Sequence, residues 1–169
     1  MRAALPAVLA ALVVTVLVPV PATAGPVLAE PPVATAWTLP LAGAMAVTRP
    51  FEAPAHAYGP GHRGVDLAGA PGAPVLAAGD GVVVFAGMVA GRPVVSVDHA
   101  DGLRTTYEPV DPGVGAGQRV ARGAPIGALV TGHAGCPVEA CLHWGLRRGE
   151  DYLDPLLLLV VRVRLLPLR

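Results

Sequence analysis

The chain has 169 residues, of which 53% are hydrophobic, so it can bury one sizeable core but is too short for two domains of ordinary size. Its 12 basic and 12 acidic residues give a formal net charge of zero, and no basic patch stands out, which argues against nucleic acid as the partner. Gly and Pro are abundant, at 21 and 19 residues, and stand between Val-rich runs, a composition that predicts the turns of an all-β domain.

The N-terminus has the features of a secretory signal peptide. Arg2 is followed by an apolar stretch over residues 3–20 and then by the small-residue site Ala22-x-Ala24. Two prolines shorten the core of this stretch to roughly fifteen residues, which favours a cleaved peptide over an uncleaved membrane anchor. We therefore expect residues 1–24 to be removed and residues 25–36 to form a Pro/Ala-rich linker. The mature protein would then be exported, with no membrane attachment.

Short β-prone runs alternate with Gly or Pro from residue 37 to about residue 160, without a convincing amphipathic helix. Polar and apolar residues alternate in the two runs that flank Ala100-Asp101-Gly102, which predicts a hairpin of half-buried strands. An apolar segment at 156–161 should close the core as a last strand or turn, with 161–169 as a tail. The predicted strands are Pro74–Ala77, Gly81–Gly87, Pro93–His99, Gly102–Glu108, Gln118–Val120, Pro125–Val130 and Cys141–Arg147.

Two segments carry candidate metal ligands. The first is Gly61-His62-Arg63-Gly64-Val65-Asp66, in which His62 and Asp66 offer the imidazole and carboxylate groups that zinc accepts. The second is the strand Cys141-Leu142-His143-Trp144-Gly145-Leu146. Strand alternation there puts His143 on the face opposite Trp144, where it would look into a groove. In either segment alone, the histidine or aspartate is most simply explained as a polar residue on the protein surface.

Together, the two segments resemble the lysostaphin/LytM-type zinc metallopeptidases. In that family the first His and Asp, and the second His of a His-x-His strand, bind zinc. The resemblance therefore implies one Zn²⁺ per chain, held by His62, Asp66 and His143 with a fourth position open to water. Further similarity extends over residues 47–155, including the stretches 70–83 and 95–103.

The resemblance also implies a fold and an activity. The fold is a β-sandwich or barrel-like hybrid (a duplicated hybrid motif) with an open groove along one sheet, formed here by residues 37–160. The activity is that of a secreted, cell-wall-associated zinc metalloendopeptidase acting on peptide bonds in peptidoglycan. The chain also resembles family members that bind wall peptides or regulate another wall enzyme without cutting.

The chain departs from the family at both accessory histidines. Cys141 stands at the first position of the His-x-His strand, and Pro109 stands where a Tyr-x-His context is expected. A general base is commonly worth about a hundredfold to ten-thousandfold in rate, so hydrolysis is expected to be weak. Glu108 and His133 are the candidate substitutes. Strand alternation points Glu108 away from position 109, and His133 is more simply explained as a solvent-exposed loop residue.

The two cysteines, Cys136 and Cys141, lie five apart in what would be an oxidising compartment, which predicts a disulfide between them. Two free thiols would instead leave open a purely structural zinc site with Cys141 as a fourth ligand. His56 and His99 carry no predicted role in the metal site.

Overall fold

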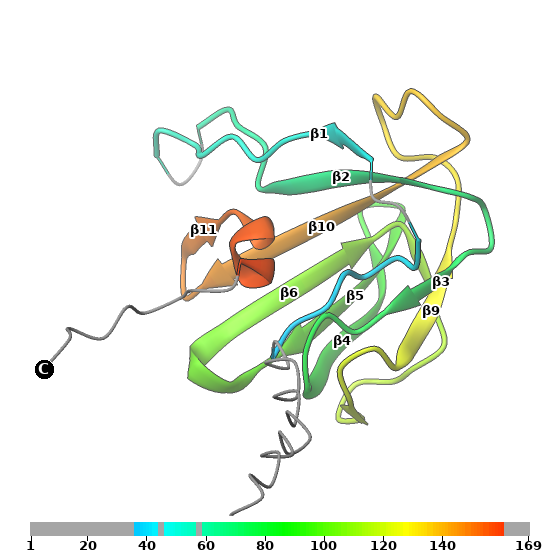
Figure 1. Ribbon diagram of the computed structural model, residues 1–169, viewed down its shortest axis with the longest axis vertical. Helices are drawn as coiled ribbons and strands as arrows, with labels where there is room; N and C mark the ends of the chain where they lie inside the picture. Colours follow the sequence, from blue (N-terminus) through cyan, green and yellow to red (C-terminus); the bar gives the residue numbers. More distant parts are fainter. Residues whose placement is uncertain (1–35, 44–45, 57–58, 161–169) are drawn as a thin grey trace, which may run out of the picture. The chain divides into compact units, whose positions relative to one another are not determined.

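The computed structural model describes residues 36–43, 46–56 and 59–160, all of which lie in one compact unit, Ala34–Arg169. The predicted signal peptide, nearly all of the predicted linker and the predicted tail lie outside these residues. The described part is all-β, as predicted, with strands in two sheets and two short 3-10 helices (Figure 1). No helix of this part is long and apolar enough to cross a membrane.

The larger sheet has eight strands in the order β1-β2-β10-β6-β5-β4-β8, with β11 paired to β10 beside this path. The smaller sheet has the order β3-β9-β7, and neither sheet closes into a barrel. All pairings between these strands are antiparallel. The register of each pair determines which side chains of the two strands lie next to each other on the same face of the sheet. The strands are β1 Val47–Arg49, β2 Gly64–Gly69, β3 Pro74–Leu76, β4 Gly81–Val89, β5 Arg92–Asp98, β6 Leu103–Glu108, β7 Val110–Pro112, β8 Arg119–Val120, β9 Pro125–Leu129, β10 Ala140–Arg148 and β11 Asp151–Leu153.

All seven predicted strands are present, with ends within two residues of those expected. The predicted hairpin turn is the 3-10 helix η1, Ala100–Gly102, in which Asp101 has a φ of 63°. The apolar segment near the end forms η2, Pro155–Leu159, and packs against the core. The strands β1, β2, β7 and β11 were not predicted, and β2 is the important omission because it carries Asp66.

The core lies between one face of the larger sheet and the smaller sheet. Alternation predicted its members well: in β10 the side chains of Leu142 and Trp144 are fully buried, and β6 contributes Tyr107. The opposite face of β2, β10, β6 and β5 carries the groove. The fully buried side chains of largest volume are Trp144, Tyr107, Leu67, Ile126, Leu129, Leu142, Val65, Val75, Val83, Val95, Val97 and Val110.

The register of the larger sheet aligns groove-face residues in rows that cross the strands. In one row, the ligand row, Asp66 and Glu108 are the partners of His143 on either side of β10. In the next row, the small-residue row, four small residues follow one another across β2, β10, β6 and β5: Gly64, Gly145, Thr106 and Ser96. Residues paired directly across antiparallel strands point to the same face, so each row is continuous on the groove side.

A chain of hydrogen bonds ties the hairpin to the core. His99 Nδ1 donates to the Asp80 carbonyl at 2.9 Å, and its Nε2 lies 2.7 Å from Thr105 Oγ1. Thr105 Oγ1 lies 2.8 Å from Tyr107 Oη, which accepts from the Ala78 amide at 2.9 Å. Burial lowers the pKa of His99, which favours its neutral form. His99 is therefore a structural residue.

Candidate metal centre

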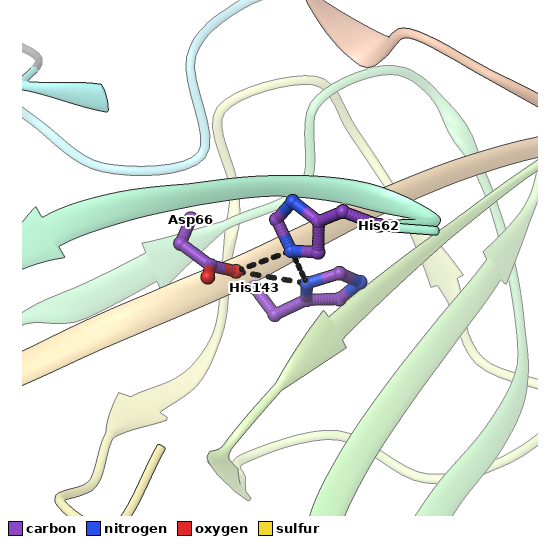
Figure 2. A group of neighbouring side chains, drawn as sticks. All are labelled: His62, Asp66 and His143. Atoms are coloured by element: carbon purple, nitrogen blue, oxygen red, sulfur yellow. Dashed lines mark hydrogen bonds and ion pairs between the residues drawn. The ribbon is translucent and has the colours of Figure 1, made fainter. Parts of the chain in front are cut away.

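Three predicted ligands, His62, Asp66 and His143, converge at one point of the groove face (Figure 2). His62 Nε2 lies 3.0 Å from Asp66 Oδ1 and 3.0 Å from His143 Nδ1, and His143 Nδ1 lies 2.9 Å from Asp66 Oδ1. Asp66 comes from β2 and His143 from the adjacent β10, at directly paired positions. His62 precedes β2 and is held by backbone hydrogen bonds in both directions with Glu52, at 2.8 and 3.0 Å.

The other nitrogen of His62 sets its tautomer. Nδ1 lies 2.6 Å from the Pro50 carbonyl, which accepts its proton, so a neutral ring presents a lone pair at Nε2. That lone pair faces Asp66 Oδ1 and His143 Nδ1. A cation bound between these three atoms would accept electron pairs from all of them. Ligand atoms around tetrahedral zinc lie roughly 3.3 Å apart, close to the 2.9–3.0 Å seen here. The three residues therefore fit a zinc ion.

Asp66 is 4% exposed and is ionised despite its burial. Burial raises the pKa of Asp66, but hydrogen bonding to His143 and His133 outweighs this and lowers the pKa to about 2. The carboxylate therefore stays charged throughout the physiological pH range. One oxygen, Oδ1, faces the two ligand imidazoles, and the other, Oδ2, is available to a neighbour.

That neighbour is His133, and its predicted exposure in a loop was wrong. Its side chain is 12% exposed, its Nε2 lies 3.0 Å from Asp66 Oδ2, and its ring stacks on His143 with centroids 5.9 Å apart. Such a contact holds the second carboxylate oxygen and orients the ligand. His133 Nδ1 is buried and has no hydrogen-bond partner in the described part of the chain.

The predicted disulfide between Cys136 and Cys141 is confirmed. It joins the His133 loop to β10 two residues before His143, and the Cys136 amide donates to the His133 carbonyl at 3.3 Å. Because both sulfurs are bonded to each other, Cys141 is not available as a thiolate ligand, which removes the four-ligand structural site.

Glu108 faces the groove, and the inference that it points away from the site was wrong. Strand alternation correctly places Glu108 on the face opposite Tyr107. That face carries the groove, because Glu108 is the direct partner of His143 in the pairing of β6 with β10. Its side chain is 18% exposed, and Arg92 Nε lies 3.6 Å from its Oε1. Pro109 is buried and offers no titratable group at the accessory position.

The groove beside the ligands has a volume of about 510 Å³. Its floor is formed by three members of the small-residue row, and arginines stand around it. Pattern analysis of the sequence did not identify these arginines or the Pro50 carbonyl, since neither belongs to a local motif. The lining residues are Arg63, Arg92, Ser96, Arg104, Thr106, Glu108, His143, Gly145, Leu146, Arg147 and Tyr152.

The sequence matches the family model described as Peptidase family M23 over residues 60–155, more than half of the chain. An uncharacterized protein of Mycobacterium tuberculosis (strain ATCC 25618 / H37Rv) is 55% identical over 134 residues, covering 76% of this chain and 54% of that protein. The chain thus spans about half the length of the curated relatives it matches.

Among the solved structures that share the fold are a peptidase and lysostaphin. A zinc containing peptidase from Vibrio cholerae has a TM-score of 0.60 and 26% identity, covering 76% of this chain and 41% of that chain. Lysostaphin has a TM-score of 0.53 and 26% identity, covering 66% of this chain and 49% of that chain. These similarities agree with the resemblance seen in the sequence.

Proposed function

The chain belongs to peptidase family M23, and from this premise we propose that it is an exported zinc metalloendopeptidase that cuts peptide bonds in peptidoglycan. The observation that carries this function is the convergence of His62, Asp66 and His143 beside a groove. Three protein ligands with an open position are typical of catalytic zinc sites, whereas structural sites usually have four. The likeness to a zinc containing peptidase supports the choice of metal.

A bound zinc ion would polarise the amide carbonyl and make water more acidic at neutral pH. The remaining work falls to the chain's own side chains. We assign the general base to Glu108, because it pairs with His143 and is the carboxylate among the described residues that line the groove; it would accept the proton of the attacking water. His133 keeps Asp66 oriented through Nε2, and the proton that Glu108 takes from water is the one available to the departing amine.

We propose that hydrolysis is slower than in family members with both accessory histidines. Those histidines serve proton transfer and oxyanion stabilisation, and this chain has Pro109 and a disulfide-bonded Cys141 in their places. Glu108 supplies a base but no positive charge for the oxyanion, and Arg92 at 3.6 Å competes for its carboxylate. Mutational losses of a general base are about a hundredfold to ten-thousandfold, which sets the scale of the difference.

The test combines metal analysis with release of new amino groups from peptidoglycan by the purified protein. We expect one zinc per chain, lost in His143→Ala, and release that stops on chelation. Glu108→Gln should lower release at least about a hundredfold while zinc content stays unchanged. Glu150→Gln is the matched control, since that glutamate lies at the β10–β11 turn with its side chain 97% exposed.

Full zinc content in His143→Ala would contradict the ligand assignment. Unchanged release by Glu108→Gln would remove Glu108 from the mechanism, and His133→Gln, with exposed His56→Gln as control, would then show whether His133 is the base.

A second function is favoured by the two replaced histidines. In this case the groove would dock a cell-wall peptide, or another wall enzyme, with zinc bound and no cleavage. A purified protein that binds peptidoglycan in the presence of zinc and releases no new amino groups would establish this function and exclude the peptidase.

The proposed place of action is outside the cytoplasm, at the cell wall. Its support is the signal-peptide pattern of residues 1–24 and the disulfide, since disulfides persist in oxidising compartments. N-terminal sequencing of the secreted protein should find Gly25 first, whereas a membrane-held chain starting at Met1 would contradict cleavage.

A further inference from the structure

We propose that the groove next to the metal centre binds a carboxylate carried by the substrate, so that this chain prefers acidic peptides. This inference rests on the proposed function, because it assumes that a peptide bond is cut at the metal centre. The evidence for carboxylate binding is the set of charged side chains that line the groove. Four arginines line the groove, a third of the 12 basic residues of a chain whose formal net charge is zero. Glu108 is the one carboxylate among the described residues that line it.

The four arginines differ in how firmly they are held. Arg104 donates two hydrogen bonds to Asp98, one of them at 2.8 Å, and this pair is already satisfied. Arg63 packs over the Tyr152 ring at 5.3 Å and donates to the Gly59 carbonyl at 3.1 Å. These two arginines therefore shape one side of the groove and are not assigned as carboxylate donors.

Arg92 and Arg147 have only loose ion-pair partners. Arg92 Nε lies 3.6 Å from Glu108, and Arg147 Nη1 lies 3.9 Å from Glu150 and donates to the Gly149 carbonyl at 3.3 Å. The Arg147 pair is exposed at Glu150 and contributes little, the Arg92 pair is exposed only on its arginine side, and each guanidinium has five N–H donors, of which these contacts use few. Both arginines therefore have donors to spare for a carboxylate, which planar guanidinium groups bind through two parallel hydrogen bonds.

The floor between these arginines leaves room for a peptide. Gly145, Thr106 and Ser96 follow one another across β10, β6 and β5 and carry no side chain larger than threonine. The volume of about 510 Å³ falls within the roughly 300–1,000 Å³ of small-ligand sites. Because this floor begins beside His143, a carboxylate held by Arg92 or Arg147 belongs to a residue close to the bond at the metal centre.

The test measures binding separately from cleavage. Fluorescein-labelled Ala-Glu-Ala-Glu-Ala amide and its Gln counterpart are titrated with the full chain by fluorescence anisotropy, with zinc and with EDTA. We expect the Glu peptide to bind at least about tenfold more tightly under both conditions. Arg92→Gln combined with Arg147→Gln should reduce this preference to less than about twofold. Arg119→Gln on β8, outside the groove lining, should leave it unchanged.

Equal binding of the two peptides would overturn the inference. So would a preference that survives in the double Gln variant or that disappears on chelation, because the carboxylate would then be bound by other residues or by the metal. If circular dichroism shows that the Gln variants do not fold, Lys variants of the same two arginines replace them in the test. Lysine keeps the positive charge but cannot form two parallel hydrogen bonds to a carboxylate, so the preference for the Glu peptide should decrease.

Cleavage of the same peptides distinguishes the two hypotheses. A chain that prefers the Glu peptide in binding and cuts neither peptide, nor peptidoglycan, supports the inference and contradicts the peptidase. A chain that cuts peptidoglycan and binds both peptides equally contradicts the inference alone.

Discussion

Gly64 lies under the His143 ring, where there is no space for a side chain. A Cβ at this position would lie 2.4 Å from the Trp144 carbonyl oxygen and 2.7 Å from His143 Nε2. We expect Gly64→Ala to displace β10 or the His143 ring, to weaken zinc binding and to lower the free energy of unfolding by about 1–3 kcal/mol. Zinc content and urea denaturation measure both effects.

The matched control is Gly145→Ala in the same row. Its added Cβ would lie 3.3 Å from the Arg63 carbonyl oxygen and 3.8 Å from His143 Nε2, so a small shift accommodates it. Wild-type zinc affinity in Gly64→Ala would show that the His143 ring has another position from which it can bind the metal.

Tyr107 connects the buried hydrogen-bond chain to the core. Its side chain is fully buried, and its hydroxyl accepts the Ala78 amide proton. Tyr107→Phe leaves that buried donor unsatisfied, so we expect the free energy of unfolding to fall by about 1–3 kcal/mol. Tyr152→Phe, at the 37% exposed tyrosine of the groove rim, should change it by less than about 0.5 kcal/mol.

The same residue predicts an alkaline dependence of stability. Burial raises the pKa of Tyr107 from 10.0 to about 12, so in this pH range the folded chain keeps a proton that the unfolded chain loses. The contribution is fully present below pH 10 and is lost as the pH rises to about 12. Absorbance at 295 nm should show one tyrosine that titrates near pH 12 and is missing in Tyr107→Phe.

At the scale of elements, the disulfide holds the loop between β9 and β10 against the metal centre. Breaking it by Cys136→Ser with Cys141→Ser should free His133 from Asp66 and lower peptidoglycan hydrolysis by up to about a hundredfold, with zinc retained. Amino-group release and zinc content are measured on the same sample.

A double-mutant comparison shows whether the disulfide acts through His133. If it does, His133→Gln should have little further effect once the disulfide is removed, because the two changes disturb one contact. Two independent and additive losses would contradict this coupling.

The alternation of polar and apolar residues predicted those strands that have one face in the core and the other face toward the groove. β6 and β10 alternate between a buried and a groove-facing side, and their core residues were identified correctly. β2 lies between β1 and β10 and is buried from Gly64 to Leu67, so it shows no alternation and was missed.

The ligands themselves were found because a family motif marks them, whereas their neighbours were not. Whether Glu108 faces the site depends on the pairing of β6 with β10, and the position of His133 depends on its contact with a strand early in the chain. These long-range relations leave no trace in the local alternation of residues.

At the scale of the whole molecule, metal binding and folding are linked. The three ligands tie the segment before β2 to β2 and β10, so zinc should bind the folded chain and not the unfolded one. Free zinc at about a hundred times its dissociation constant should add about 2.7 kcal/mol to the free energy of unfolding. Thermal unfolding followed by circular dichroism, with zinc and with EDTA, measures the shift.

His143→Ala should unfold at the same temperature with and without zinc, whereas His56→Ala should respond as the wild type does. A zinc-dependent shift in His143→Ala would place the stabilising metal at another site.

The strands under the groove also determine how a peptide can be read. β10, β6 and β5 are each paired on both sides, so their backbone groups are already used within the sheet. A peptide lying over these three strands therefore cannot join them as an added strand, the mode of recognition in which main-chain hydrogen bonds supply the affinity. Over these strands it meets side chains and the metal centre. Recognition there depends on which side groups a ligand carries and how they are spaced, because the sheet offers it no main-chain partners.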